Sequence, residues 1–243
     1  MLIALMTLLA AGIVKGAIGS GVPVIVVPVL TMLYDVQLAI AVLVAPNLIS
    51  NALQVWQYRR HLLPLRFLAL FSLAGGLGIV LGTWGLVVLS AELLSLGVAG
   101  AIVLYLAIKV ARRRMALPFN LAERIVIPAG LLAGVLQGAA GMSAPASVTF
   151  LNAMQLERRV FIGSISVFFV AITSVQIPAL LSAGILTLER FLYSVVALII
   201  IVAAMPLGAH LGKRLPHRWF DNLIMLLLAG IACKIFIDAW LAS

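Results

Sequence analysis

Two short glycine-rich segments are the strongest candidates for a binding site in this sequence. Residues 16–21 read GAIGSG, and residues 138–143 read GAAGMS. Glycines that interrupt a helix leave backbone N–H groups without partners, and a helix that resumes after the break points its positive end at the gap. Such a tip can hold an anion without any formal charge, and serine hydroxyls add donors. We therefore predict anion contacts from Gly16, Gly19, Ser20, Gly21, Gly138, Gly141 and Ser143.

The same glycines have an alternative explanation, which is close packing of helices in a membrane. We favour the binding site because the pattern occurs twice and a proline, Pro23 or Pro145, follows each copy. A proline is tolerated in the first turn of a helix, so each proline is consistent with a helix that resumes after the tip.

Lys15 directly precedes the first tip and lies within a long apolar segment. A charged residue at depth in a membrane is a functional hypothesis in itself, and here its ammonium could neutralise an anionic ligand. The alternative is a lysine whose head group extends to the membrane surface. The equivalent residue of the second segment is Gln137, so we predict ligand contacts from both residues, with the charge in only one.

Amide and hydroxyl side chains form a stripe on one face of the helix expected at residues 36–58. Asn47, Ser50, Asn51 and Gln54 fall within an arc of about 100° at the spacing of an α-helix. Thr173 and Gln176 lie 122 residues after Asn51 and Gln54. Such groups are costly toward lipid, so they face either a water-filled path or another helix to which they bond. We favour the path, with ligand contacts from Asn47, Asn51, Gln54, Thr173 and Gln176.

The chain contains two similar halves, which we place at residues 1–115 and 116–243. Residues 9–23 and 131–145 share seven identical positions at an offset of 122 residues. Later glycines, Gly78, Gly82 and Gly100, match Gly208, Gly212 and Gly230 at an offset of 130. An ordered glycine and proline pattern that occurs twice indicates an internal repeat.

Composition indicates an all-α polytopic membrane protein. Hydrophobic residues make up 65% of the 243 residues and charged residues only 9%, which leaves too little polar surface for a soluble domain of this size. We expect apolar helical segments near residues 2–33, 36–58, 64–88, 91–110, 122–154, 157–182, 188–211 and 219–240. The first segment of each half is too long for one span, so we expect a helical hairpin with arms of about 14 residues, with a pair of short spans as the alternative.

The basic residues test this topology. If each hairpin enters and leaves on one side, 13 of the 16 Lys and Arg residues lie in loops on a single face, near residues 59–66, 109–124, 157–159 and 213–221. The positive-inside rule then places these loops in the cytoplasm and both termini outside. Each half has an odd number of full crossings, so the second half is inverted relative to the first, as in many transporters. The net charge of +9 therefore arises from loops on one face of the membrane, and we expect no binding of nucleic acid.

The glycine and proline pattern of the two tips, together with the stretch PLGAHLGKRLP at residues 206–216, resembles the TauE/SafE family. The resemblance covers nearly the whole chain. It implies a transporter of the inner membrane for sulfite, sulfonates or related organosulfur or carboxylate anions.

We therefore expect a secondary transporter that is not an enzyme and needs no cofactor, since phosphate-binding loops, paired carboxylates and metal-ligand motifs are missing from the sequence. Expected partners are the small anionic substrate, a coupling proton or sodium ion, and the lipid bilayer. A homodimer is an alternative to a monomer. The competing function is a membrane scaffold or subunit without a substrate path of its own.

Overall fold

The computed structural model describes residues 2–18, 21–111, 116–211 and 230, and the described residues contain helices and no strand. This confirms the all-α class. The helices are α1 (Leu2–Ile18), α2 (Val22–Leu33), α3 (Val36–Val42), α4 (Val44–Tyr58), α5 (Leu65–Val88), α6 (Ala91–Ala111), α7 (Phe119–Ala140), α8 (Ser147–Ala153), α9 (Arg158–Ser182) and α10 (Leu188–Leu211). The segment expected at residues 219–240 lies outside the described residues.

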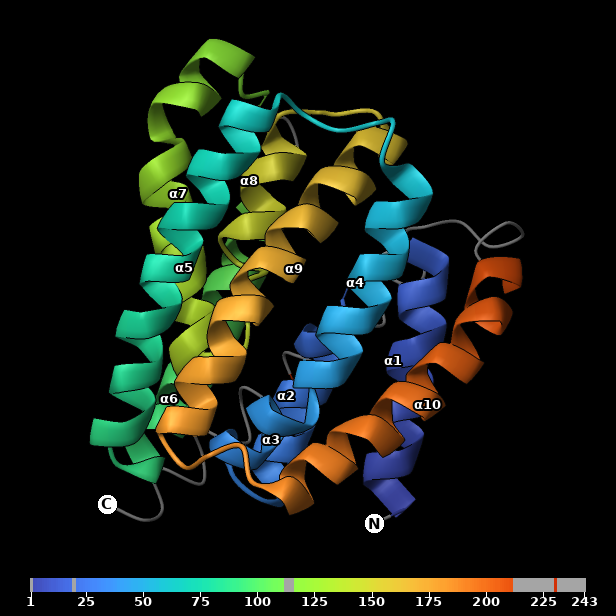
Figure 1. Ribbon diagram of the computed structural model, residues 1–243, viewed down its shortest axis with the longest axis vertical. Helices are drawn as coiled ribbons and strands as arrows, with labels where there is room; N and C mark the ends of the chain where they lie inside the picture. The colour runs from blue at the N-terminus through green and yellow to red at the C-terminus, as the bar shows by residue number, and fades with distance from the viewer. Residues whose placement is uncertain (1, 19–20, 112–115, 212–229, 231–243) are drawn as a thin grey trace.

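Apolar helices long enough to cross a bilayer make up most of this bundle (Figure 1). Within the described part, five stretches meet that length and hydropathy: residues 36–58, formed by α3 and α4, and the helices α5, α7, α9 and α10. Their lipid-facing surfaces carry large apolar side chains, such as Leu73, Leu77 and Trp84 on α5, each about two-thirds exposed. The protein is therefore a multi-pass membrane protein.

The broken first segment of each half folds into a helical hairpin (Figure 1). The helices α1 and α2 form one hairpin that returns to the end where the chain begins, and α7 and α8 form the other, which enters from the opposite end. The backbone N–H of Leu117, before α7, donates to the carbonyl of Ala153 at the end of α8, so the second hairpin closes on itself.

The arms are less equal than about 14 residues each, and that expectation is wrong. The entering arms α1 and α7 have 17 and 22 residues, whereas the returning arms α2 and α8 have 12 and 7. The break in the second hairpin, between Ala140 and Ser147, also occupies more of the chain than the glycines alone indicate.

Residues 36–58 form two helices, which corrects the single helix expected there. The helix α3 ends at Val42 and α4 begins at Val44. Pro46, in the first turn of α4, lacks the N–H that would continue a helix from α3. The backbone N–H of Ala45 donates instead to the hydroxyl of Ser194 on α10 at 2.8 Å.

Each hairpin packs against a long helix of the other half. The helix α7 lies along α5, and α1 lies along α10. Glycines allow these contacts: a Cβ at Gly82 of α5 would lie 2.8 Å from the backbone nitrogen of Ala139, and a Cβ at Gly12 of α1 would lie 2.6 Å from the carbonyl oxygen of Ile201. No real Cβ contact is this short, so only glycine permits these backbones to approach so closely.

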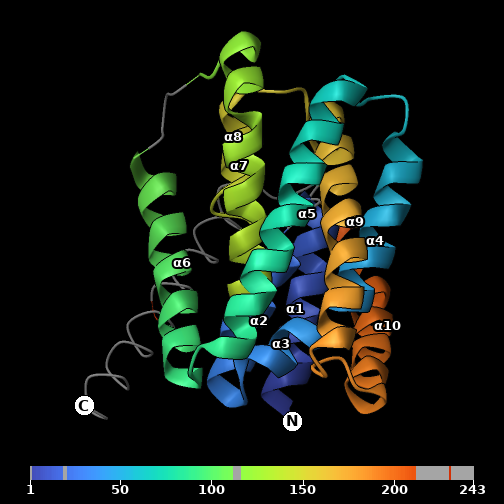
Figure 2. The ribbon, with the colours of Figure 1, turned by 60° about the vertical axis from the view of Figure 1, so that its left-hand side comes forward.

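Two apolar clusters fill the bundle. One cluster lies around the first hairpin with α3, α6 and α10, and the other joins α5, α7, α8 and α9. The second is rich in phenylalanine; the stacked rings of Phe71 and Phe168 have centroids 4.0 Å apart. The helix α9 lies between α5 and α4 (Figure 2), and it contacts both of them.

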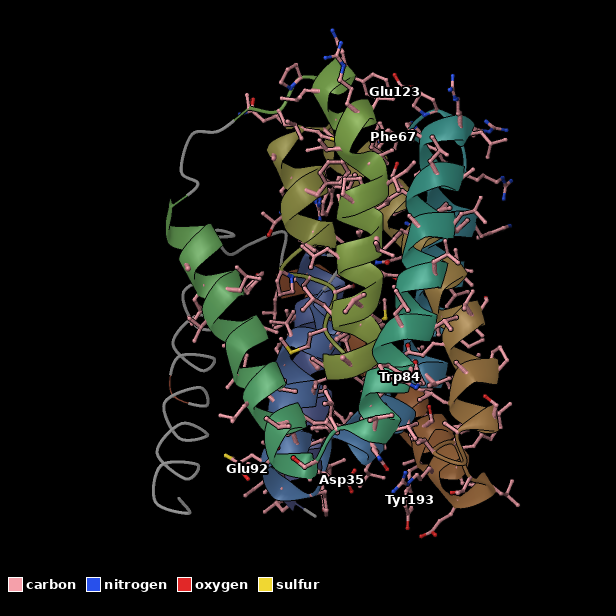
Figure 3. All side chains as sticks on the ribbon, turned by 90° about the vertical axis from the view of Figure 1, so that its left-hand side faces the viewer. Asp35, Phe67, Trp84, Glu92, Glu123 and Tyr193 are labelled. Carbon is pink, nitrogen blue, oxygen red and sulfur yellow. The ribbon has the colours of Figure 1, made fainter. Side chains whose placement is uncertain are left out.

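Charged side chains divide between the two ends of the molecule. Glu123 lies at one end and Asp35 and Glu92 lie at the other (Figure 3). The α4–α5 loop and the start of α9 belong to the first of these ends, which we call the arginine-rich end because it carries Arg59, Arg60, Arg124, Arg158 and Arg159. This grouping agrees with the loops that the basic residues place on one face.

Candidate functional site

A seam of buried polar side chains runs between α4 and α9. It contains the expected stripe of α4, with Asn47, Ser50, Asn51 and Gln54 all under 8% exposed. On α9, Ser166, Thr173 and Gln176 are at most 2% exposed. The hydroxyl of Ser166 donates to Oε1 of Gln54 at 3.0 Å, which joins the two helices directly. We call these seven residues the polar seam.

Lys15 of the first hairpin contacts this seam. Its side chain is 3% exposed, and its Nζ donates to Oδ1 of Asn51 at 3.2 Å. Nδ2 of Asn51 donates in turn to the carbonyl of Asn47 at 2.7 Å, which fixes the amide with its oxygen toward the lysine. The lysine therefore does not extend to the membrane surface.

Among the residues that the structure describes, no carboxylate balances the ammonium of Lys15. In the described ranges, no ion pair involves Lys15, and the buried polar side chains include neither aspartate nor glutamate. A buried charge with only a neutral amide partner is costly, because an amide offsets little of the lost hydration. An anion that enters beside Lys15 would offset this cost.

The second hairpin contacts the seam through the neutral amide of Gln137, at the position where the first hairpin has the charged Lys15. Nε2 of Gln137 lies 3.4 Å from Oε1 of Gln176, and Nε2 of Gln176 donates to the carbonyl of Gln137 at 3.3 Å. Oε1 of Gln137 also accepts the backbone N–H of Ser143 at 3.1 Å. Gln137 therefore links the tip of its hairpin to α9, as Lys15 links the first hairpin to α4.

Ser143 lies inside the break of the second hairpin. Its hydroxyl and its carbonyl both accept from the hydroxyl of Ser147, at 3.2 and 3.0 Å. Both serines are at most 1% exposed. Ser147 was not among the residues expected from the sequence, and its spacing of four residues from Ser143, about one helical turn, is the signal that could have identified it.

The glycines of the tips divide into two groups. Gly16 and Gly138 lie at helix crossings, where an added Cβ would meet the backbone of Met205 and Thr83 respectively. The structure thus gives these two a packing role, and their contact with a ligand stays a prediction. Gly21 and Gly141 have positive φ angles of 106° and 66°, so the two breaks themselves depend on glycine. Gly19 and Ser20 lie outside the described residues.

The tip of the second hairpin lies beside the returning arm of the first. A Cβ at Gly141 would lie 3.1 Å from Val27 on α2 and 2.8 Å from Ile40 on α3. Val27 follows Gly21 by six residues, or about 9 Å along a helix. The two hairpins therefore overlap in depth, with the second tip beside the middle of α2.

The polar contacts span about half of a bilayer. Gln176 follows Ser166 by 10 residues on α9, which is about 15 Å of helix, and a hydrocarbon core is about 30 Å thick. The structure places Lys15 with Asn51 and Asn47, Gln137 with Gln176 and Ser143, and Gln54 with Ser166. Ser166 was not among the expected residues, although it shares a helix face with Thr173 and Gln176.

The family described as sulfite exporter TauE/SafE matches residues 4–235. Neither a curated protein nor a solved structure matches the chain.

Proposed function

Because this chain belongs to the TauE/SafE family of membrane transporters, we propose that it is a secondary transporter that carries a small oxyanion along the polar seam. The substrate class is sulfite, a sulfonate or a related organosulfur or carboxylate anion. The observation that carries this proposal is Lys15, a buried cation bonded to Asn51 with no carboxylate partner among the described residues. A negatively charged substrate supplies the missing charge.

The seam supplies the rest of such a site. The amides of Asn51 and Gln176 each have two N–H donors and use one on a backbone carbonyl, so the second can donate to an anion oxygen. Because the seam lies between two apolar clusters, a ligand there is shielded from lipid on both sides. The same shielding strengthens each polar contact, since the local dielectric is low.

The arrangement of the halves supports a transport cycle. We propose that the second half is an inverted copy of the first and that the arginine-rich end faces the cytoplasm across the inner membrane. Hairpins that enter from opposite ends, and the exchange of partners in which α7 packs on α5 and α1 packs on α10, support this relationship.

Uptake of radiolabelled sulfite tests the proposal. Purified protein in liposomes is expected to accumulate sulfite faster than empty liposomes, and methanesulfonate in excess is expected to reduce that rate. The control is a cation of similar size, such as methylammonium, which should not compete. A wild-type protein that moves neither sulfite, methanesulfonate nor acetate would favour the scaffold function instead.

A further inference from the structure

A second cation contacts the first hairpin from the other half of the chain. Arg158 is the first residue of α9, and its Nη2 atom donates to the carbonyl oxygen of Ala17 at 3.2 Å. Ala17 lies in the last turn of α1, two residues after Lys15. The guanidinium of Arg158 therefore stands within about one helical turn of the backbone of Lys15.

Arg158 also continues the seam face of α9. At 100° per residue, Ser166, Thr173 and Gln176 lie within about 80° of Arg158 around the helix axis. The side chain thus occupies the arginine-rich end of the same face that carries the buried hydroxyl and amide groups. An anion that follows this face from that end meets Arg158 before it meets Lys15.

The chemistry of the side chain suits this position. Arg158 is exposed, and the described residues give it one hydrogen bond, to Ala17, and no ion pair. A guanidinium has five N–H donors in a planar fork, so most of them remain available to a ligand. That fork matches two oxygens of a carboxylate, sulfite or sulfonate group, and charge-assisted bonds of this kind are strong.

We propose that Arg158 forms a separate anion-binding station at the cytoplasmic mouth of the seam, which receives the oxyanion before Lys15. This inference rests on the proposed function. The bond to Ala17 holds the guanidinium at the mouth and links the bound anion to the hairpin that carries Lys15. The station is asymmetric, because it serves the arginine-rich end only.

Arg159 provides a matched control. It is adjacent, equally charged and exposed, and the structure describes no hydrogen bond from its side chain to the hairpin. Changes in general surface charge therefore affect Arg158→Gln and Arg159→Gln alike. A change in sulfite transport that occurs in Arg158→Gln and not in Arg159→Gln is therefore evidence for the station.

The experiment measures the half-saturation concentration for sulfite from each face, in proteoliposomes whose orientation is known. From the arginine-rich face, Arg158→Gln is expected to raise this concentration about tenfold, the effect of one charge-assisted hydrogen bond, and Arg159→Gln less than twofold. From the opposite face, both variants are expected to stay within about twofold of the wild type. Arg158→Lys keeps a donor for Ala17 but loses the fork, so an intermediate rise of about threefold is expected.

Three results would overturn the station. The first is an equal half-saturation concentration for Arg158→Gln and Arg159→Gln, and the second is an equal rise of this concentration from both faces. The third applies if Arg158→Gln yields no folded protein, and it is a half-saturation concentration for Arg158→Lys that equals that of the wild type. Absence of uptake of sulfite, methanesulfonate and acetate alike by the wild type contradicts the proposed function itself, so the two failures are distinguishable.

Discussion

Nζ of Lys15 lies 3.2 Å from Oδ1 of Asn51, a contact between the first hairpin and α4. The second hairpin makes a corresponding contact with α9, from Gln137 to Gln176. The two contacts differ in charge, because an ammonium occupies one and an amide the other. Transport of an anion should therefore depend far more on Lys15 than on Gln137.

Replacement of Lys15 by glutamine tests this dependence. Lys15→Gln is expected to lower the initial rate of sulfite uptake at least about tenfold, since the neutral amide cannot balance an anion. The fold should persist, because glutamine already occupies the equivalent position 137. Uptake into liposomes and the thermal unfolding midpoint in detergent measure the two effects. Normal transport by Lys15→Gln would remove Lys15 from the mechanism.

Leucine at Asn51 or Gln176 tests the seam. Each substitution removes an amide that bonds to a hairpin, at a cost of about 1 kcal/mol in a membrane, so the protein should remain folded and inserted. Sulfite uptake is expected to fall by about tenfold. Ser174→Leu is the control, because Ser174 follows Thr173 on α9 but is exposed. If both seam variants transport at the wild-type rate, the seam serves packing alone.

The glycine contact between α5 and α7 should be essential for assembly. A Cβ at Gly134 would lie 2.9 Å from the Cα atom of Gly78, so Gly134→Leu must separate the two helices. We expect loss of the monodisperse peak in size-exclusion chromatography. Among the residues that the structure describes, a Cβ at Gly100 of α6 meets no atom within 4 Å, so Gly100→Leu should elute as the wild type does. Equal behaviour of the two variants would contradict this packing.

Gly141 combines two constraints that a matched pair can separate. Both Gly141 and Gly184 have positive φ angles, 66° and 68°, so alanine at either position costs about 1–2 kcal/mol of backbone strain. Within the described part of the chain, only at Gly141 does the new Cβ also meet a side chain, Ile40 at 2.8 Å. Gly141→Ala should therefore lower the unfolding midpoint further than Gly184→Ala, and it should reduce sulfite uptake. Equal midpoints would exclude the contact with Ile40.

Single cysteines at the two ends test the orientation. Cys233 is the single cysteine of the sequence. In a Cys233→Ser background, Glu123→Cys is expected to react with a membrane-impermeant maleimide only after the cells are opened. Glu92→Cys, at the opposite end, should react in cells whose outer membrane is permeable. The motivation is the gathering of arginines at the end that holds Glu123. The reverse labelling pattern would place the arginine-rich end outside.

The sequence predicts the local features of this fold well. Broken first segments, inward polar groups and the basic loops all follow from residue types at helical spacing. The burial of Asn51, Gln54 and Gln176 agrees with this, because an amide toward lipid is costly. Contact of these residues with substrate stays a prediction.

The long-range partners could not be predicted. A glycine permits either an unwound tip or a close helix crossing, and only the position of another helix decides between them. Gly16 meets α10 and Gly138 meets α5, and neither partner lies near them in the sequence. The sequence likewise does not distinguish Arg158 from the other loop arginines. Only the structure shows that the carbonyl of Ala17, in the first hairpin, accepts a hydrogen bond from it.

The exchange of partners between the halves has a consequence for biosynthesis. The backbone that faces Gly16 belongs to Met205, about 190 residues later in the chain. At about 5–20 residues per second, a ribosome needs roughly 10–40 s to complete that interval. During this time α1 resides in the membrane with its glycine face against lipid or the insertion machinery. The first hairpin therefore reaches its final packing only after most of the chain has been translated. This helix packing forms after the first helices have already been inserted into the membrane.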